Sequence, residues 1–331
     1  MLIKDYVQYW YRLYRMPYQA ETTRATYSSI IENHIVDTYF GQLEISDVKS
    51  QDIQQYLTNT MLYGNKAVYV NKQKVRNTSL SYHTMNKLRQ IVVACFAQAV
   101  KDGIISKNIA ANTSPIPLVW QDKPVFTPDM QHKFLESTKS HRFYTAYVML
   151  FFLGCRRSEL LGLAWDSVDL RKNTITIRQA LVVVAGTPML VSKTKTKTSN
   201  RVIPFPTAIK ELLRKWKQQQ IAESKLAGYS NEANLVFTNK DGSPHNPTYF
   251  SRNFKAMIKK LDCCPDSLHV HSVRHTWATN MIQCGIAITD VQALGGWSRP
   301  DTLLNIYAHT VKESQRKAVN KLYQLLNGDD K

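Results

Sequence analysis

The stretch His271-Ser-Val-Arg274-His-Thr is followed by Gly296-Trp297 and then by Asn305-Ile-Tyr307-Ala-His309. Because residues three apart lie on the same side of a helix, His271 and Arg274 can both face one phosphate group. Arginine offers a planar fork of donors that matches phosphate oxygens, and histidine can move a proton near neutral pH. Trp297 can donate through its indole N–H, and a deprotonated tyrosine hydroxyl can act as a covalent nucleophile. The stretch therefore holds the groups needed to attack a phosphodiester.

Two further motifs lie upstream, Leu153-Gly-Cys-Arg156-Arg-Ser-Glu159-Leu and Lys193-Thr-Lys195-Thr-Lys197-Thr-Ser-Asn-Arg201-Val-Ile-Pro204. A lone H-x-x-R pattern is more often surface or capping chemistry, and 17 tyrosines give Tyr307 no special claim by residue type. In their order, however, the motifs resemble those of the tyrosine recombinases, the phage integrase family. That pattern is G-x-R-x-x-E, a lysine hairpin ending in R-x-I-P, H-x-x-R, L-G-[HW] and a tyrosine. The resemblance is strong over residues 125 to 310 and weaker over the N-terminal third.

The resemblance implies a role for each residue of the phosphate site. Arg156 and Arg274 are expected to hold the non-bridging phosphate oxygens in the transition state. Trp297 adds a neutral donor at a place where many family members carry histidine. Tyr307 is the expected nucleophile. Because a free tyrosine has a pKa of about 10, His271 and the two arginines must supply a base or a positive field.

Lys195 is the expected general acid, which gives a proton to the leaving 5′-hydroxyl. The choice rests on its position nine residues before Pro204, which matches the family hairpin. Lys193 and Lys197 remain alternatives, and all three could instead be surface cations that bind phosphate. Glu159 follows Arg156 by three residues and could orient it without touching the substrate. We assign no chemistry to three neighbours of these motifs, which are expected to point elsewhere or to be structural: Arg157, His275 and His309.

No cofactor, metal or ATP is expected. The sequence contains no G-x-x-x-x-G-K-[ST] motif and no visible carboxylate cluster for a two-metal site. The resemblance implies a covalent 3′-phosphotyrosine intermediate, which keeps the energy of the broken phosphodiester until another 5′-hydroxyl attacks it.

The composition indicates a polyanionic partner. Lysine and arginine outnumber aspartate and glutamate by 43 to 25 in 331 residues, giving a net charge of +18. Charge alone places double-stranded DNA only slightly ahead of RNA, and an acidic protein is also possible. The chain shows no apolar run long enough for a membrane span and no signal peptide. The five cysteines lack zinc spacing, so we expect reduced thiols in a bacterial or phage-infected cytoplasm, near the nucleoid.

Residues 1–112 predict a helical DNA-binding domain that resembles the SAM-like core-binding domain of the family. Apolar spacing indicates helices over residues 4–15 and 22–36, after an N-cap at Ser50, and over residues 81–101 with Gly103 as the terminating glycine. Between them, Gly64 to Asn77 is expected to be a phosphate-contacting or solvated loop. Its candidate DNA-binding cations are Lys66, Lys72, Lys74 and Arg76.

Residues 113–124 contain three prolines and predict a linker, after which Thr127 and Pro128 open a helix. The fold class is therefore mainly α, with a mixed α+β catalytic domain at 125–310. The resemblance implies that the two domains form a C-shaped clamp around DNA. Strands are expected over residues 174–184, 189–192 and 201–204, as a small three-stranded antiparallel sheet with the lysine turn before its last strand. Lys193 and Lys197 are further candidate DNA contacts.

The leading hypothesis is a site-specific DNA recombinase, most like integrases of phages or conjugative transposons, that integrates or excises a mobile element. Alternatives are a type IB topoisomerase-like enzyme, a Xer-like chromosome-dimer resolvase, or a DNA-binding regulator without catalysis. The resemblance implies a homo-tetramer on att-type DNA, a monomer or weak oligomer when free, and DNA-bending accessory proteins. The amphipathic segment 311–331 is expected to form a helix that neighbouring protomers exchange or that packs within its own chain. Because the chain opens at what resembles the core-binding domain, we expect a simple recombinase or a form lacking an arm-binding domain.

Overall fold

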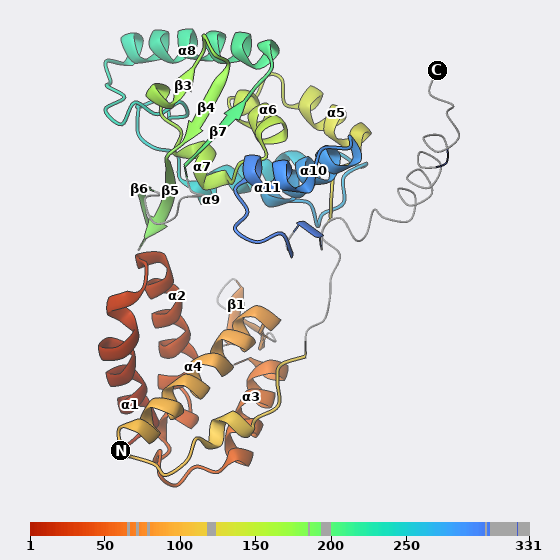
Figure 1. The fold of residues 1–331 in the computed structure, drawn as a ribbon. Helices are drawn as coiled ribbons and strands as arrows, with labels where there is room; N and C mark the ends of the chain where they lie inside the picture. The colour runs from red at the N-terminus through yellow and green to blue at the C-terminus, as the bar shows by residue number, and fades with distance from the viewer. Residues whose placement is uncertain are drawn as a thin grey trace. The chain divides into compact units, whose positions relative to one another are not determined.

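The computed structural model describes residues 1–64, 67–70, 73–77, 80–117, 124–184, 186–192, 200–301, 303–304 and 323, with the backbone alone for 67–70 and 73–77 (Figure 1). The chain divides into two compact units, Met1–Gln121 and Asp122–Lys331. Each unit has its own apolar core, and each is described by itself. Within the parts of the chain that the structure describes, no helix is long and apolar enough to cross a membrane.

Among its described residues, the first unit contains four α-helices: α1 (Ile3–Trp10), α2 (Glu21–Ile31), α3 (Ser50–Tyr63) and α4 (Tyr82–Lys101). Two of them continue without a break into π-helical turns, Tyr11–Arg15 after α1 and Glu32–Val36 after α2. Short 3₁₀ turns complete the unit: Met16–Tyr18, Phe40–Gln42 and Ile109–Asn112. The four predicted helices are therefore confirmed, and Gly103 follows the cap of α4 in the left-handed conformation that was expected of it (φ +73°).

The core of this unit gathers the apolar faces that the helical spacing predicted. Val7, Trp10 and Ile35 are almost fully buried, and Phe40 stacks on Tyr56 at 4.2 Å between ring centroids. Burial of aromatic and aliphatic side chains is the main favourable term in folding such a unit. The helices are thus held by their apolar stripes.

Two expectations for the first unit were wrong in detail. Ser50 is the first residue of α3 and not its N-cap, because the carboxylate of Asp52 accepts the Lys49 backbone N–H at 2.9 Å and caps the helix. The segment expected to be a loop forms an antiparallel hairpin of β1 (Ala67–Val70) and β2 (Gln73–Asn77). Its β-branched and aromatic residues favour strands, and this preference outweighs the many polar residues around them.

The second unit contains seven helices and five strands within its described residues. The helices are α5 (Pro128–Ser137), α6 (Tyr144–Leu153), α7 (Arg157–Leu161), α8 (Thr207–Ala227), α9 (Pro247–Ile258), α10 (Val270–Gln283) and α11 (Ile288–Gly295). The strands are β3 (Val168–Asp169), β4 (Thr174–Ile177), β5 (Gln179–Val184), β6 (Thr187–Ser192) and β7 (Arg201–Pro204), with a 3₁₀ turn at Trp165–Ser167. The mixed helical and antiparallel class is confirmed.

The strand pairing differs from the prediction. The expected strand over residues 174–184 is interrupted at Arg178, so that β4 pairs with β7 and β5 pairs with β6. The three-stranded sheet therefore has the order β3-β4-β7, and β5-β6 is a separate hairpin. In β4 and β7 the opposed residues Ile175 and Ile203 are both buried, and this shared burial decides the partner. A period-two pattern shows which face is buried, but it does not identify the neighbouring strand.

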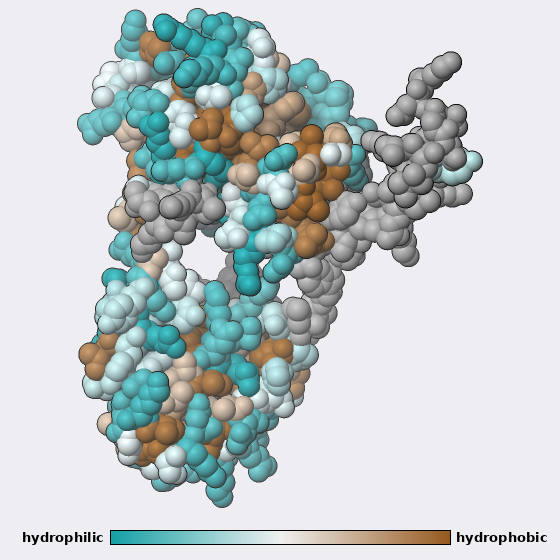
Figure 2. All heavy atoms as spheres, in the orientation of Figure 1, coloured by the Kyte–Doolittle hydropathy of each residue, from teal (hydrophilic) through white to brown (hydrophobic). Residues whose placement is uncertain are grey.

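Helices α6 and α8 of this unit differ in how far they are buried. α6 is buried on almost every side, as its apolar sequence predicted, and delivers the Arg156 motif at its end. α8 lies beside the three-stranded sheet and turns a hydrophilic face outward (Figures 1 and 2). Its inner face is anchored by Trp216, whose indole N–H donates to the Val236 carbonyl at 2.6 Å. α6 thus lies within the apolar core, whereas α8 lies at the surface of the unit.

Candidate active site

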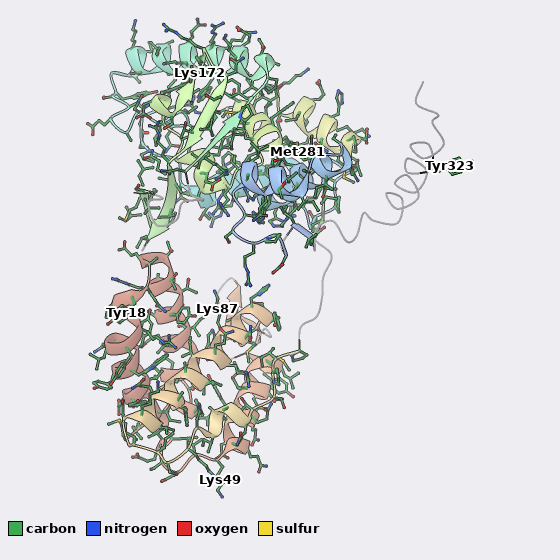
Figure 3. The ribbon with its side chains drawn as sticks, viewed as in Figure 1. Tyr18, Lys49, Lys87, Lys172, Met281 and Tyr323 are labelled. Atoms are coloured by element: carbon green, nitrogen blue, oxygen red, sulfur yellow. The ribbon has the colours of Figure 1, made fainter. Side chains whose placement is uncertain are left out.

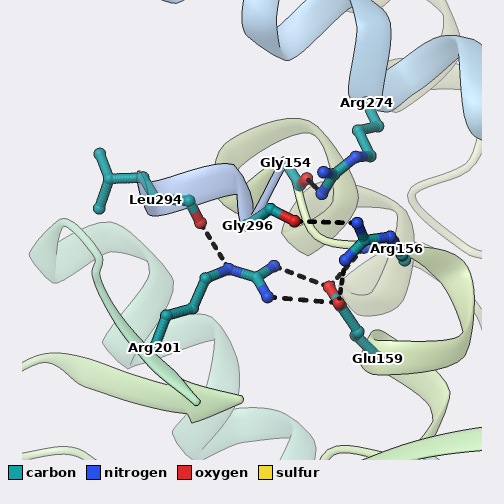
Figure 4. Close-up of polar contacts among 7 residues, drawn as sticks. All are labelled: Gly154, Arg156, Glu159, Arg201, Arg274, Leu294 and Gly296. Carbon is teal, nitrogen blue, oxygen red and sulfur yellow. Dashed lines mark hydrogen bonds and ion pairs between the residues drawn. The ribbon is translucent and has the colours of Figure 1, made fainter. Parts of the chain in front are cut away.

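Arg156 stands at the N-cap of α7, immediately after α6 ends at Gly154. Its Nη1 donates to Oε1 of Glu159 at 2.8 Å, and its Nη2 donates to the Gly296 carbonyl at 2.9 Å (Figure 4). Its backbone N–H donates to the other carboxylate oxygen of Glu159 at 2.8 Å. The Arg156 side chain keeps 41% of its surface exposed, whereas Glu159 has none. The carboxylate therefore fixes the guanidinium from beneath and leaves an outer face for an anion.

Arg274 projects from α10 and is 2% exposed. Its Nη1 donates to the Gly154 carbonyl at 2.7 Å, and its guanidinium lies 3.6 Å from the ring centroid of Trp297. Its Nη2 is buried and has no hydrogen-bond partner among the described residues. Burial, together with the positive charges of Arg156 and Arg201, lowers the pKa of Arg274 to about 9. Nη2 of this charged guanidinium can therefore donate a hydrogen bond to a bound anion.

Arg201 begins β7 and also reaches Glu159. Its Nη1 and Nη2 donate to the two carboxylate oxygens at 3.2 and 2.7 Å, and its Nε donates to the Leu294 carbonyl at 2.6 Å (Figure 4). In the sequence this arginine belongs to the R-x-I-P motif, which by itself predicts no role for it. The alternation in the strand could have identified it, because Arg201 lies on the same face as the buried Ile203.

The charges of this cluster do not balance. Arg156, Arg201 and Arg274 face a single carboxylate, Glu159, so the four side chains together carry two positive charges. An unbalanced buried charge is costly unless an opposite charge joins it. The arrangement therefore suits a phosphate group, whose negative charge increases as a nucleophile attacks.

Trp297 follows a tight turn that two glycines allow. Gly296 has φ +71° and caps α11, and a Cβ at Gly295 would overlap the Trp297 ring. The ring lies against the guanidinium of Arg274, and it is nearly parallel to the Trp277 ring, at 16° with 6.2 Å between the ring centroids. Other apolar side chains pack against this pair, including Met281 of α10 (Figure 3). The face of Trp297 is thus occupied by Arg274, and its indole edge alone is left to act as a donor.

His271 lies at the start of α10 and is exposed, one turn before the buried Arg274. Its ring lies 4.6 Å from that of His275, edge to face, because residues four apart on a helix share a side. We had expected His275 to point elsewhere, and in this respect the expectation was wrong. Arg157 does point elsewhere, since its Nη1 donates to the Ser251 hydroxyl at 2.5 Å.

The structure brings Arg156, Glu159, Arg274 and Trp297 into one connected cluster, with His271 on the same helix as Arg274. Lys74 and Arg76 lie on β2, and their side chains are outside the described part of the chain. The remaining candidates lie outside the described residues altogether: Lys66, Lys72, Lys193, Lys195, Lys197 and Tyr307.

Comparison with known proteins shows the family of the chain. A sequence model of the phage integrase family matches residues 125–314, and a model of the N-terminal SAM-like domain of phage integrases matches residues 2–61. The chain belongs to the phage integrase family. It is a tyrosine recombinase, a site-specific enzyme that cleaves and rejoins DNA.

Named relatives share this family. The recombinase is 25% identical over 321 residues to a XerC-like tyrosine recombinase of Caldanaerobacter subterraneus, covering 92% of this chain and 78% of the relative. It is 25% identical over 300 residues to the ICEBs1 integrase of Bacillus subtilis, covering 90% of this chain and 76% of the relative.

Solved structures share the fold. The Tn1549 transposon integrase, in complex with transposon right end DNA, superposes with a TM-score of 0.79 at 21% identity, covering 98% of this chain and 100% of that chain. A lambda integrase dimer bound to a core site gives a TM-score of 0.66 at 15% identity, with 92% and 77% covered. The helical and mixed units of this recombinase therefore follow the architecture of integrases.

Proposed function

We propose that this recombinase is the integrase of a mobile element and acts through a covalent 3′-phosphotyrosine. The observation that carries the proposal is the cluster of Arg156, Arg274 and Glu159, which holds surplus positive charge and a guanidinium nitrogen, Nη2 of Arg274, that has no hydrogen-bond partner among the described residues. A scissile phosphate placed there accepts from Arg156 and from Nη2 of Arg274. A phosphate at this point brings its negative charge against the net charge of two that Arg156, Arg201, Arg274 and Glu159 carry together.

The steps of cleavage follow from this placement. The hydroxyl oxygen of Tyr307 attacks phosphorus and gives its proton to a base, for which His271 is the candidate. The new bond joins the tyrosine oxygen to phosphorus, and the bond from phosphorus to the 5′-oxygen breaks. Lys195 gives a proton to that oxygen. Arg156, Arg274 and the indole N–H of Trp297 hold the charge that builds on the non-bridging oxygens.

Rejoining reverses these steps with a 5′-hydroxyl from another strand. Because the phosphotyrosine keeps the energy of the phosphodiester, neither ATP nor a metal takes part in this scheme. Lys66, Lys72, Lys74, Arg76, Lys193 and Lys197 are proposed to contact the phosphates of att-type DNA, which the domains 1–112 and 125–310, joined by the linker 113–124, would hold between them. We place this activity in the cytoplasm.

Assembly as a homo-tetramer on DNA is part of the proposal. An apolar surface on α10 and α11 supports it (Figure 2): Ile286 is 38% exposed, and Met281, Ile282 and Ile288 are only partly buried. Segment 311–331 carries Val319, Leu322, Leu325 and Leu326 at helical spacing, and such a stripe fits an apolar surface on another protomer. Accessory DNA-bending proteins would assist this assembly.

A Xer-like resolvase is the second candidate, because the relatives include proteins named as XerC and XerC-like recombinases. The two functions differ in their DNA. An integrase cleaves the ends of its own element, whereas a resolvase cleaves one chromosomal site.

A covalent-trapping assay tests the nucleophile. A nicked duplex carrying the DNA beside the gene's own locus is incubated with wild type and with Tyr307→Phe, and the products are resolved on a denaturing gel. The proposal expects a slow protein–DNA adduct with wild type and none with the variant. An adduct that survives in Tyr307→Phe would disprove the nucleophile.

The general acid is identified with a second substrate whose 5′-bridging oxygen is replaced by sulfur. A thiolate leaves without a proton, so the variant that lacks the general acid recovers on this substrate and the others do not. We expect Lys195→Ala to cleave the sulfur substrate at a rate close to that of wild type. Lys193→Ala and Lys197→Ala should show the same rate relative to wild type on both substrates. Recovery by one of the other two would move the role to that lysine.

A further inference from the structure

Arg201 takes no part in the steps above, yet it contacts the groups that do. Its side chain is 7% exposed, and it forms an ion pair with Glu159, which is fully buried. Each of its three guanidinium nitrogens is engaged: two donate to the carboxylate and Nε donates to the Leu294 carbonyl. Three of its five N–H groups are used in this way, and burial encloses the Arg201 side chain within the protein, so we expect it to make no contact with DNA.

The contacts of Arg201 close a ring. Glu159 also holds Arg156, and Arg156 in turn holds the Gly296 carbonyl, two residues beyond the carbonyl that Arg201 holds (Figure 4). The Glu159 carboxylate thus orients both arginines. Both also donate hydrogen bonds to backbone carbonyls at the end of α11. Charge-assisted hydrogen bonds of this kind are the stronger ones in proteins and fix the plane of a guanidinium.

That turn carries Trp297. Gly296 lies so close to Arg201 that a Cβ on the glycine would be 2.8 Å from Nη1 of the arginine. The Trp297 ring lies under the guanidinium of Arg274. A shift of Arg201 therefore reaches all of the expected phosphate donors: Arg156 through the carboxylate, and Trp297 and Arg274 through the turn.

We propose that Arg201 is a positioning residue for strand cleavage. It fixes Arg156 and the Trp297 turn together, and it ties both to β7, the strand that follows the lysine segment 193–199. By neutralising Glu159, it also leaves the charges of Arg156 and Arg274 for the phosphate. This inference rests on the proposed function, because it assigns Arg201 a part in the same reaction.

A matched arginine separates positioning from simple stabilisation. Arg142 also bridges a carboxylate and a backbone carbonyl, donating to both oxygens of Glu223 at 2.8 Å and to the Thr238 carbonyl at 3.1 Å. It lies in the same unit and takes no part in the ring. Arg142→Met therefore removes an ion pair of the same kind, although a more exposed one (20% and 23% for Arg142 and Glu223), and serves as the control for Arg201→Met.

The test uses the full chain and the nicked duplex that wild type cleaves, made with either a phosphate or a methylphosphonate at the cleaved position. A methylphosphonate lacks the negative charge that the arginines must hold, so it depends less on their placement. We expect Arg201→Met to form adduct about 10- to 100-fold more slowly than wild type on the phosphate. On the methylphosphonate it should come within about threefold of wild type, because little charge needs to be stabilised there.

Arg142→Met should lose the same factor on both substrates. An equal loss on both substrates for Arg201→Met would overturn the inference and leave Arg201 as a structural ion pair. Absence of a Tyr307-dependent adduct with wild type would instead overturn the proposed function. Because Arg201→Met leaves Glu159 with a single cation, the double variant Glu159→Gln/Arg201→Met is measured as well. If it folds and shows equal losses on both substrates, the inference also fails.

Discussion

Replacing Arg274 with methionine is expected to stabilise the DNA-free protein while it abolishes strand cleavage. The guanidinium is 2% exposed, its Nη2 has no hydrogen-bond partner among the described residues, and Arg156 and Arg201 add like charge around it. Methionine matches the arginine side chain as far as Nε and carries no charge. The substitution thus removes a charge that the free protein holds at a cost and that the bound phosphate compensates.

The size of this effect follows from the pKa of Arg274, which is lowered from its usual value to about 9. A lowering of this size corresponds to about 5 kcal/mol against the folded state. Because the folded state binds this proton more weakly than the unfolded state, the penalty is fully present at all pH values below about 9 and is relieved as the pH rises above it. At pH 7 it therefore acts in full.

Two losses oppose this gain. The Gly154 carbonyl would lose its donor, which costs about 1–3 kcal/mol when the oxygen stays buried, and the contact with the Trp297 ring contributes about 1 kcal/mol. We expect a net increase of about 1–3 kcal/mol in the free energy of unfolding, within the range found when buried charges are replaced by apolar side chains.

Urea unfolding at pH 7 in phosphate-free buffer, followed by tryptophan fluorescence, measures this change. Inorganic phosphate should raise the stability of wild type and not that of Arg274→Met, because binding to the folded state alone stabilises it. The adduct assay should show a loss of at least about 10²-fold. The control Arg142→Met, which strands the Glu223 carboxylate, should be destabilised. An Arg274→Met protein destabilised as much as this control would refute the reasoning.

Two further predictions concern other parts of the fold. Gly154→Ala and Gly103→Ala both force alanine into a left-handed conformation, which costs about 1 kcal/mol, but only the Cβ at Gly154 would overlap a ring, that of Trp277. Urea unfolding should therefore show Gly154→Ala to be less stable by a further 1–3 kcal/mol or so, and equal losses would contradict the packing. Burial and Arg142 lower the pKa of His245 to about 4, so stability should fall as the pH drops below about 6.5. The loss should reach about 2 kcal/mol at pH 5, and His245→Phe should abolish it; an unchanged pH profile would exclude His245 as the cause.

The sequence was informative wherever the signal is local. Apolar spacing identified the helices of the first unit and the buried helix α6, and Gly103 and Thr127 marked helix ends as predicted. These features depend on neighbours within one or two turns, so a short window contains their causes. The motifs around Arg156 and His271 indicated the family for the same reason, because each motif is only a few residues long.

Partners far apart in the sequence were decided only by the tertiary structure. The β-branched residues of 174–184 predict one strand, but the shared burial of Ile175 and Ile203 pairs its first half with β7 and leaves its second half to β6. Likewise, Arg156 and Arg201 lie far apart in the sequence, and no local pattern shows that they share the carboxylate of Glu159. The sequence by itself determined which chemical groups are available and which faces are buried. Only the fold decided which buried charges meet, because a carboxylate removed from water takes whichever cations the packing brings within hydrogen-bonding distance.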